Sequence, residues 1–280
     1  MKILKNHNMR EHSNMKIGGV TKNFFIVENK EELKDIADNY ENLFVIGNGT
    51  NTLINDKDLK TNFISLKEIK FVKDDGNGTV EVGAGLDFSE FVKYTEEADY
   101  EGLENLAGIP GSVGGLVYMN GGAYGSEIFD HIIEIEVLDE NKNIRRVKKE
   151  NIDFSYRKTE IQEKKWIVIS ATFRFGKGHK KTVVTEKTST RENRHPLELP
   201  NLGSSFKNPE GYFAAKLIIE AGMQGFRVGD AQMSTKHPNF IVNLGNATFA
   251  DIRELISKVK AAVVEKTGIL LEEEIVIVDE

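Results

Sequence analysis

Glycines and small polar residues gather in two segments whose backbone could bind an anion. Residues 47–51 read GNGTN, and a turn of this composition presents successive amide groups that together form an anion nest. The same letters also suit an ordinary hairpin turn, which Asn-Gly favours by itself. The segment lacks the G-x-G-x-x-G spacing, and the next stretch, residues 52–58, is too short for a helix, so it is not a Rossmann dinucleotide fingerprint.

The second segment is longer and richer in glycine. Residues 102–125 hold 8 of the 25 glycines, in GIPGSVGG (108–115) and NGGAYG (120–125) among others. A glycine inside an element costs about 1 kcal/mol relative to alanine, so this density indicates a ligand that approaches the backbone closely. The alternative is a long surface loop, but such loops are usually functional or disordered. The apolar residues within the segment argue against disorder.

Two segments carry side chains suited to charge stabilisation or proton transfer. In FSYRK (154–158), Arg157 lies beside aromatic residues and could hold a carboxylate and stabilise developing negative charge. The alternative is a solvated arginine at the end of a short helix. In GSSFKNP (203–209), Ser204 could act as a nucleophile, an acid or a turn residue, although the spacing is not that of the α/β-hydrolase nucleophile.

Carboxylates and histidines add weaker candidates. In LEEEI (271–275), an alternating strand would place Glu272 and Glu274 on one face and Glu273 on the other, which also suits a charged edge strand. His195 and His237 could act as bases. Each precedes a proline in a loop, so a capping or structural role is the better interpretation.

Composition excludes several chemistries. The 280 residues contain no cysteine, which excludes disulfides, thiolate catalysis, iron–sulfur clusters and cysteine-ligated zinc, and we expect no metal centre. The net charge of −7 disfavours a general nucleic-acid binder. Residues 176–240 nevertheless carry 10 Lys and Arg against 6 Asp and Glu, a local excess of positive charge that suits a phosphorylated ligand.

No secretory or membrane segment is predicted. The first 14 residues lack the apolar stretch of a signal peptide. No stretch approaches the ~18–20 consecutive apolar residues of a membrane helix. We therefore expect a cytoplasmic protein that binds no membrane.

The elements that must position these segments are predicted from hydrophobic periodicity and capping residues. Helices are expected at residues 29–40, 88–98, 183–194, 212–221 and 249–266. Strands are expected at residues 43–46, 52–54, 63–66, 69–72, 79–83, 132–138, 144–148, 166–175 and 270–278, with a hairpin turn at 140–143. Capping boxes are predicted for Asn29 with Glu32 and for Thr248 with Asp251, and Gly268 should end the last helix. Strands in hairpin series predict an α+β protein with mixed, largely antiparallel sheets.

Taken in order along nearly the whole chain, these segments resemble the UDP-N-acetylenolpyruvoylglucosamine reductases. This family, also called UDP-N-acetylmuramate dehydrogenases, comprises flavoproteins of bacterial peptidoglycan synthesis. The matching segments are residues 17–19, 47–51, 102–115, 120–125, 156–157, 203–209, 225–243 and 271–275. Several short matches in the correct order are far more specific than any one of them.

The resemblance implies an FAD-binding domain of the vanillyl-alcohol-oxidase (PCMH) type, made of two subdomains, and a C-terminal α+β substrate-binding domain. We assign residues 1–70 to the first subdomain, 71–195 to the second and 196–268 to the substrate domain, with a C-terminal strand at 269–280 returning to the second subdomain. The resemblance also implies a tightly bound FAD that accepts a hydride from the co-substrate NADPH. The flavin N5 then gives a hydride to the vinyl carbon of UDP-N-acetylglucosamine-enolpyruvate, which becomes UDP-N-acetylmuramate.

Residue by residue, the resemblance implies that Arg157 and Glu274 stabilise the enolate and that Ser204 protonates it. Glu274 suits this role only if it carries or shares a proton. The residues expected to hold FAD are Gly47, Asn48, Gly49, Thr50, Asn51, Gly108, Ile109, Pro110, Gly111, Ser112, Gly114, Gly115, Asn120, Gly122 and Ala123. The residues expected to hold the UDP-sugar are Tyr156, Lys207, Asn208, Arg227, Lys236 and Asn239.

Two departures from the family pattern limit this transfer. Only residues 176–182 separate the 166–175 strand from the next helix, too few for the tyrosine-bearing loop that closes over the uridine in the long form. The chain therefore resembles the shorter form. Gly121 stands where the family typically has alanine, which adds backbone freedom.

Two other functions remain open from the sequence. Another flavin oxidase or dehydrogenase of the same fold, acting on a small alcohol or hydroxy acid, would explain the glycine segments but not residues 203–209 together with 271–275. A non-catalytic nucleotide-binding module would take up no FAD. For the main interpretation we expect a monomer that binds a UDP-sugar and NADPH and serves cell wall biogenesis, cell shape and cell division.

Overall fold

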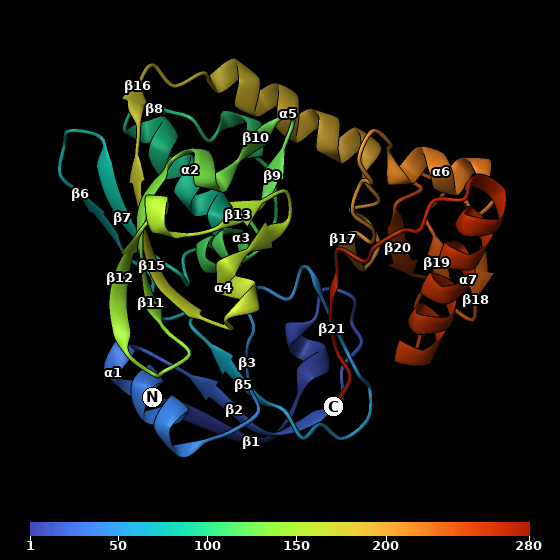
Figure 1. Cartoon of the computed structure of the whole chain (residues 1–280), viewed down its shortest axis with the longest axis horizontal. Coiled ribbons are helices and arrows are strands. Elements are labelled where there is room, and N and C mark those ends of the chain that lie inside the picture. The colour runs from blue at the N-terminus through green and yellow to red at the C-terminus, as the bar shows by residue number, and fades with distance from the viewer. The chain divides into compact units, whose positions relative to one another are not determined.

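The structure is a computed structural model that describes residues 1–280, and contacts divide the chain into two compact units (Figure 1). Unit 1 comprises Met1–Lys5, Asn23–Asn48 and Thr61–Thr190. Unit 2 comprises Asn6–Lys22, Gly49–Lys60 and Arg191–Glu280. Each unit has a hydrophobic core of its own. The finer division at residues 70, 195 and 268 stays a prediction.

Two sheets form the framework of unit 1. A five-stranded antiparallel sheet has the order β12-β11-β15-β7-β6. Its strands are β6 (Val72–Asp74), β7 (Thr79–Gly83), β11 (Ile132–Leu138), β12 (Ile144–Lys148) and β15 (Ile167–Arg174). A four-stranded sheet has the order β1-β2-β5-β3, in which β5 runs parallel to both β2 and β3. Its strands are β1 (Lys2–Asn8), β2 (Val20–Ile26), β3 (Leu43–Val45) and β5 (Asn62–Ser65).

Helices and two-residue strands complete unit 1. The apolar faces of α1, α2 and α3 contribute to the same core as the sheets. The helices are α1 (Lys30–Asn39), α2 (Phe88–Glu97), α3 (Val113–Tyr118) and α4 (Glu160–Glu163). The short strands are β8 (Tyr100–Glu101), β9 (Gly122–Ala123), β10 (Ser126–Glu127), β13 (Phe154–Ser155), β14 (Lys158–Thr159) and β16 (Gly176–Lys177). The 3-10 turns of unit 1 are η2 (Glu104–Leu106), η3 (Ile128–Asp130) and η4 (Lys149–Asn151), whereas η1 (Met9–His12) belongs to unit 2.

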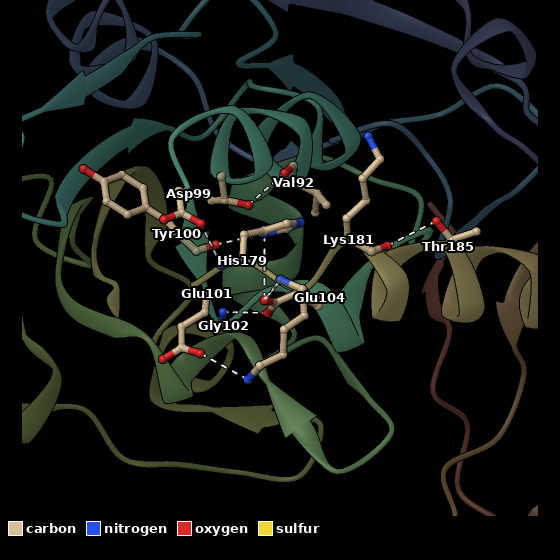
Figure 2. Close-up of polar contacts among 11 residues, drawn as sticks. Val92, Asp99, Tyr100, Glu101, Gly102, Glu104, His179, Lys181 and Thr185 are labelled. Carbon is tan, nitrogen blue, oxygen red and sulfur yellow. Dashed lines mark hydrogen bonds and ion pairs between the residues drawn. The ribbon is translucent and has the colours of Figure 1, made fainter. Parts of the chain in front are cut away.

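A polar cluster ties the start of α5 (Lys181–Arg194) to the chain around β8 (Figure 2). The buried Glu104 carboxylate accepts hydrogen bonds from the Gly102 amide at 2.6 Å and the Lys180 amide at 3.0 Å. The ring Nδ1 of His179 lies 3.0 Å from the Tyr100 carbonyl oxygen. Since a carbonyl only accepts, Nδ1 carries the proton. These bonds fix the backbone from which α5 begins.

Unit 2 is built around a four-stranded antiparallel sheet and two helices. The sheet has the order β17-β20-β19-β18, with β17 (Asn201–Ser204), β18 (Arg227–Val228), β19 (Ala231–Met233) and β20 (Phe240–Asn243). The helices are α6 (Ala214–Glu220) and α7 (Phe249–Thr267), which share one core with the sheet. Separately, β4 (Thr52–Ile54) pairs in parallel with β21 (Val276–Val278). The C-terminal strand thus pairs with a strand of the 1–70 segment and not with one from residues 71–195.

Several predicted elements have their observed bounds, and the mixed sheet pattern is confirmed. The strands β4, β7, β11 and β12 match residue for residue, and the hairpin between β11 and β12 is present. The Thr248–Asp251 capping box forms at α7, and Gly268 ends that helix with a left-handed φ of 73°. No helix of the structure is both long and apolar enough to span a membrane.

Other local predictions were wrong for identifiable reasons. The capping box at Asn29 is incomplete, because the Glu32 carboxylate accepts from the Glu28 amide and from the N-terminal ammonium group. The predicted strand at 69–72 begins only at Val72. Of the predicted strand at 270–278, only β21 is regular; residues 271–275 bond to other loops instead. The strands β1 and β2 and the glycine-containing helix α3 were not predicted.

Candidate functional site

The first glycine segment and the 108–115 segment meet at Gly47 and Ser112 in unit 1. A Cβ added at Gly47 would lie 2.7 Å from the Ser112 hydroxyl oxygen, so any larger residue would have to displace it. That hydroxyl accepts from the Gly115 amide at 3.3 Å and caps α3. The hairpin alternative for residues 47–51 is wrong, because β3 pairs with β5 whereas β4 pairs with β21.

Some backbone amides at this meeting point donate hydrogen bonds within the protein, and others have no acceptor there. The Val113 and Gly114 amides donate to the carbonyls of Leu86 and Ala84, each at 2.9 Å. The structure gives no hydrogen-bond acceptor within the protein to the amides of Gly47, Asn48, Gly111 and Ser112. Free amides on two facing backbone segments match an anion nest.

Asp87 holds the exposed Asn48 in place, a contact that no sequence pattern predicted. Its carboxylate accepts from the Asn48 side chain at 2.8 Å and from the Ser89 amide at 2.9 Å. Asp87 is also the N-cap of α2, so α2 fixes the position of the carboxylate. The remaining predicted members of this segment, Gly49, Thr50 and Asn51, belong to unit 2.

The second glycine cluster forms a tight hairpin. β9 pairs with β10 through a turn at Tyr124 and Gly125, whose φ values of 52° and 80° are both left-handed. A Cβ on Gly122 would lie 2.5 Å from the Ser126 carbonyl oxygen, so glycine is needed for the strands to approach. Gly121 has no left-handed φ, and its added Cβ would lie 3.1 Å from the Leu116 side chain. The chain's departure at this position therefore relieves crowding.

Arg157 docks on this second cluster. It lies with Tyr156 in the two-residue loop between β13 and β14 and has a φ of 56°, so the alternative of a short helix is wrong. Its guanidinium donates to the carbonyls of Asn120 at 3.2 Å and Gly122 at 2.7 Å. The guanidinium also lies 5.1 Å from the exposed Tyr156 ring.

Asn120 links the two hairpins and is fully buried. Its side-chain amide donates to the Glu127 carboxylate at 2.7 Å and to the Ser155 carbonyl at 3.0 Å. Its side-chain oxygen is buried and has no partner. An unsatisfied buried acceptor costs about 1–3 kcal/mol. This oxygen is therefore a candidate to accept a hydrogen bond from a donor group of a ligand.

In unit 2, the structure separates the two adjacent serines. Ser205 is 2% exposed, and its hydroxyl accepts from the Ile241 amide at 3.1 Å. Ser204 ends β17 after Gly203, whose φ is 75°, and is half-buried. No hydrogen bond within the protein uses its hydroxyl. Of the two serines, only Ser204 is free to act on a ligand.

Residues 272–274 run beside this serine segment. The Glu274 amide donates to the Ser205 carbonyl at 2.9 Å, and the Lys207 amide donates to the Glu272 carbonyl at 2.9 Å. On the other side, the Asn51 side chain donates to the Glu274 carbonyl at 3.3 Å. The structure thus places the backbone segments that carry Asn51, Ser204 and Glu274 next to one another in unit 2.

Glu273 plays a separate structural role. Its carboxylate accepts from the Lys260 ammonium group of α7 at 2.9 Å. Burial raises the pKa of Glu273, but the hydrogen bond from Lys260, a backbone hydrogen bond and the positive charges of Lys260 and Arg253 together outweigh burial and leave the pKa below its ordinary value. Glu273 is therefore ionised and faces α7.

Most predicted UDP-sugar residues already have partners within the protein. Lys207 pairs with Glu272, and Arg227 pairs with Asp230 at 3.1 Å. The Lys236 ammonium donates to the Glu192 carbonyl at 3.0 Å. The Asn208 side chain accepts from the first amide of α6, that of Ala214, at 3.0 Å, and Asn239 is buried against Phe206.

The two histidines near this sheet form an aromatic cluster with Phe240. The rings of His195 and His237 are 5.2 Å apart, and each packs on Phe240. Burial lowers the pKa of His195 to about 4, and the neighbouring His237 acts in the same direction. Burial also lowers the pKa of His237. Both are half-buried and neutral at neutral pH, and their packing on Phe240 fits the structural role expected of them.

Comparison with known proteins gives the same answer for both parts of the chain. A family model described as "UDP-N-acetylenolpyruvoylglucosamine reductase, C-terminal domain" matches residues 195–278, and one described as "FAD binding domain" matches residues 23–148. A UDP-N-acetylenolpyruvoylglucosamine reductase of Fusobacterium nucleatum subsp. nucleatum is 51% identical, covering 99% of this chain and 100% of that protein. One of Caldanaerobacter subterraneus subsp. tengcongensis is 38% identical, covering 100% and 94%.

A solved structure supports the fold independently. The crystal structure of the UDP-N-acetylenolpyruvylglucosamine reductase from Thermus caldophilus superposes with a TM-score of 0.83 at 31% identity, covering 99% of this chain and 98% of that one. This likeness and the two matched models confirm the predicted fold of an FAD-binding domain followed by a C-terminal α+β domain. With identity extending over essentially the full length, the chain belongs to the UDP-N-acetylenolpyruvoylglucosamine reductase family.

Proposed function

We infer that this chain reduces UDP-N-acetylglucosamine-enolpyruvate to UDP-N-acetylmuramate, with NADPH as the co-substrate and FAD as the bound cofactor. The reaction adds a hydride to the vinyl carbon and a proton to the adjacent α-carbon of the enolpyruvyl ether. The electron pair comes from NADPH, which leaves as NADP⁺. When bound, FAD supplies the hydride relay between the two substrates.

One observation within the molecule carries this inference beyond kinship. Ser204 has a free hydroxyl, whereas its neighbour Ser205 has its hydroxyl committed to the fold. The Ser205 carbonyl holds the Glu274 amide at 2.9 Å, so a proton-bearing side chain and a carboxyl lie on adjoining backbones. A free hydroxyl on a segment bonded to that of a carboxyl supports a role in delivering a proton to an anionic carbon.

Residues of unit 1 fit the proposed cofactor. The free amides of Gly47, Asn48, Gly111 and Ser112 would bind the FAD pyrophosphate, and the close approach at Gly47 leaves no room for a side chain. The unpartnered oxygen of Asn120 would accept a hydrogen bond from the cofactor. Gly114 has a different role, because its added Cβ would lie 2.7 Å from that of Ala84.

We propose three catalytic roles on these segments. Arg157 stabilises the enolate by its charge, and the Asn120 and Gly122 carbonyls hold the guanidinium in one orientation. Glu274 stabilises the same anion as a protonated carboxyl, since an ionised carboxylate would repel it. Ser204 delivers the proton to the α-carbon, and Glu274 or Arg157 stabilises the oxygen that remains.

Separated half-reactions test this proposal. Bleaching of the flavin absorbance by NADPH reports the first half, and its return on addition of the enolpyruvyl substrate reports the second. Arg157→Ala and Glu274→Ala should lose most product formation. Ser204→Ala should bleach normally and then stall, whereas Ser205→Ala is the matched control for a serine that is committed to the fold. Normal turnover by Ser204→Ala, or a preparation that takes up no FAD, would contradict the proposal; turnover with oxygen and a small hydroxy acid would favour the oxidase alternative.

We also propose a cellular setting. The chain would act in the cytoplasm as a monomer that binds neither membrane nor nucleic acid, and supply a precursor for peptidoglycan, cell wall biogenesis, cell shape and cell division. The excess of positive charge at residues 176–240 suits a UDP-sugar. Light scattering of the purified protein at several concentrations tests the monomer, and membrane fractionation tests the location.

A further inference from the structure

Asn239 is a buried polar side chain whose carboxamide is fully used inside unit 2. It is 4% exposed and lies just before β20. Its side-chain oxygen accepts from the Phe206 amide at 3.0 Å, and its side-chain nitrogen donates to the Phe206 carbonyl at 2.8 Å. Both backbone groups of one residue are therefore paired with a single side chain.

This pairing replaces a strand partner where regular pairing stops. The register of β17 with β20 is broken between Asn201 and Ser204, and beyond Ser204 no regular ladder continues. A carboxamide has the donor and acceptor of a peptide group. The Asn239 side chain therefore continues the ladder by one residue, and the Asn239 carbonyl accepts from the Ser205 amide at 2.7 Å.

The opposite edge of the same segment is bonded to the glutamate segment. The Glu274 amide donates to the Ser205 carbonyl, and the Lys207 amide donates to the Glu272 carbonyl. Residues 205–207 are thus bonded to Asn239 on one side and to residues 272–274 on the other, with an isolated β-bridge between Phe206 and Glu273. A shift of this segment would displace both Ser204 and Glu274.

We propose that Asn239 is a positioning residue for Ser204 and Glu274, acting through the Phe206 backbone, and not a direct ligand of the UDP-sugar. The inference rests on the proposed function, because it assigns a role toward two residues whose catalytic roles are proposals. Without Asn239, the buried Phe206 amide and carbonyl would lose their partners and the segment would relax. A displacement of about 1 Å costs up to ~10²-fold in rate.

A matched control lies four residues further along the same chain. Asn243 ends β20 and is 2% exposed, and its carboxamide bonds to the backbones of Met15, Gly245 and Ala247. Asn243→Ala therefore measures the general cost of losing a buried asparagine from this part of the sheet. None of these hydrogen bonds involves residues 204–207.

The test combines hydrogen exchange with the separated half-reactions. In Asn239→Ala, peptides covering residues 203–208 should exchange at least tenfold faster, and product formation should fall between about tenfold and 10²-fold more than flavin reduction by NADPH. Asn243→Ala should lower the unfolding temperature by a similar amount without either change. If Asn239→Ala is too unstable, Asn239→Asp keeps the acceptor for the Phe206 amide, loses the donor, and should slow product formation about tenfold.

The outcomes separate this inference from the proposed function. If Asn239→Ala behaves like Asn243→Ala in exchange and in both half-reactions, the positioning role is overturned while the proposed function stands. Slower product formation with unchanged exchange would assign Asn239 to direct substrate contact and overturn the inference as well. Normal turnover by Ser204→Ala in the same assays would overturn the proposed function, and with it the catalytic half of this inference.

Discussion

Gly47→Ala is the sharpest test of where the two glycine segments of unit 1 meet. The added Cβ would lie 2.7 Å from the Ser112 oxygen but 3.7 Å from the Ser112 Cβ, which is an ordinary contact. The hydroxyl must therefore rotate away and give up its hydrogen bond to the Gly115 amide. Losing such a cap costs about 1 kcal/mol, or about 2–4 °C in unfolding temperature for a chain of this size.

A double-mutant cycle turns this contact into a number. Ser112→Ala alone loses the same cap and should cost the same ~1 kcal/mol. In Gly47→Ala/Ser112→Ala the new methyl meets no oxygen, so the two costs should not add, and we expect a coupling of about 1 kcal/mol. Thermal unfolding of the flavin-free proteins, followed by circular dichroism, measures each corner of the cycle.

FAD affinity should behave differently from stability in the same cycle. If the Gly47 and Asn48 amides hold the pyrophosphate, a methyl on residue 47 obstructs the approach whatever occupies position 112. FAD affinity, measured by quenching of flavin fluorescence, should fall at least about tenfold, or ~1.4 kcal/mol, in both Gly47→Ala proteins. Additive stability losses would refute the contact, and unchanged FAD affinity would refute the anion nest.

Three further perturbations act on named contacts. Burial lowers the His195 pKa to about 4, so the unfolded chain binds the extra proton as pH falls below the ordinary 6.5. Stability should therefore decline from pH 6.5 toward 4, and His195→Phe should flatten that decline in pH-dependent urea unfolding. Because the Glu273 pKa is lowered in the folded chain, the stability that its ionised form contributes is present at neutral pH and is lost as the pH falls below 4.5. Lys260→Met removes the hydrogen-bond partner of Glu273, so the unfolding free energy should already be smaller at neutral pH. Arg157→Lys keeps the charge but cannot span both the Asn120 and Gly122 carbonyls, so product formation should fall by about tenfold or more while flavin reduction by NADPH continues.

The sequence predicted elements well where one physical signal dominated. Alternating apolar residues located β7, β11 and β12, and a capping box followed by a terminal glycine located α7. It failed where tertiary contacts override local preference. α3 contains Gly114 and Gly115, which disfavour a helix, but Gly114 is the residue that lets α3 pack against Ala84.

The residue patterns singled out Arg157 and Ser204 as candidates but left ordinary alternatives open, and only the family resemblance gave them catalytic roles, which stay predictions. The sequence could not show which hydroxyl and amide groups form hydrogen bonds within the protein and which are left for a ligand. GSSFKNP offers two serines, and only the hydrogen bond from the Ile241 amide shows that Ser205 is committed. Likewise, the glycine pattern indicated that the whole segment 108–115 could bind a ligand. The structure shows that the Val113 and Gly114 amides instead donate hydrogen bonds to backbone carbonyls of the protein.

Asn120 and Asn239 entered the expected site only through the family resemblance, and the chemistry of the side chain they share explains why the residue patterns alone did not single them out. Asn120 holds the Arg157 hairpin in unit 1, and Asn239 holds the Ser204 segment in unit 2. A carboxamide offers both a donor and an acceptor without a net charge. It can therefore fix backbone groups in a buried position without the desolvation cost of an ion. A residue suited to positioning in this way carries no reactive group of its own, so a search for nucleophiles, bases and charges passes over it.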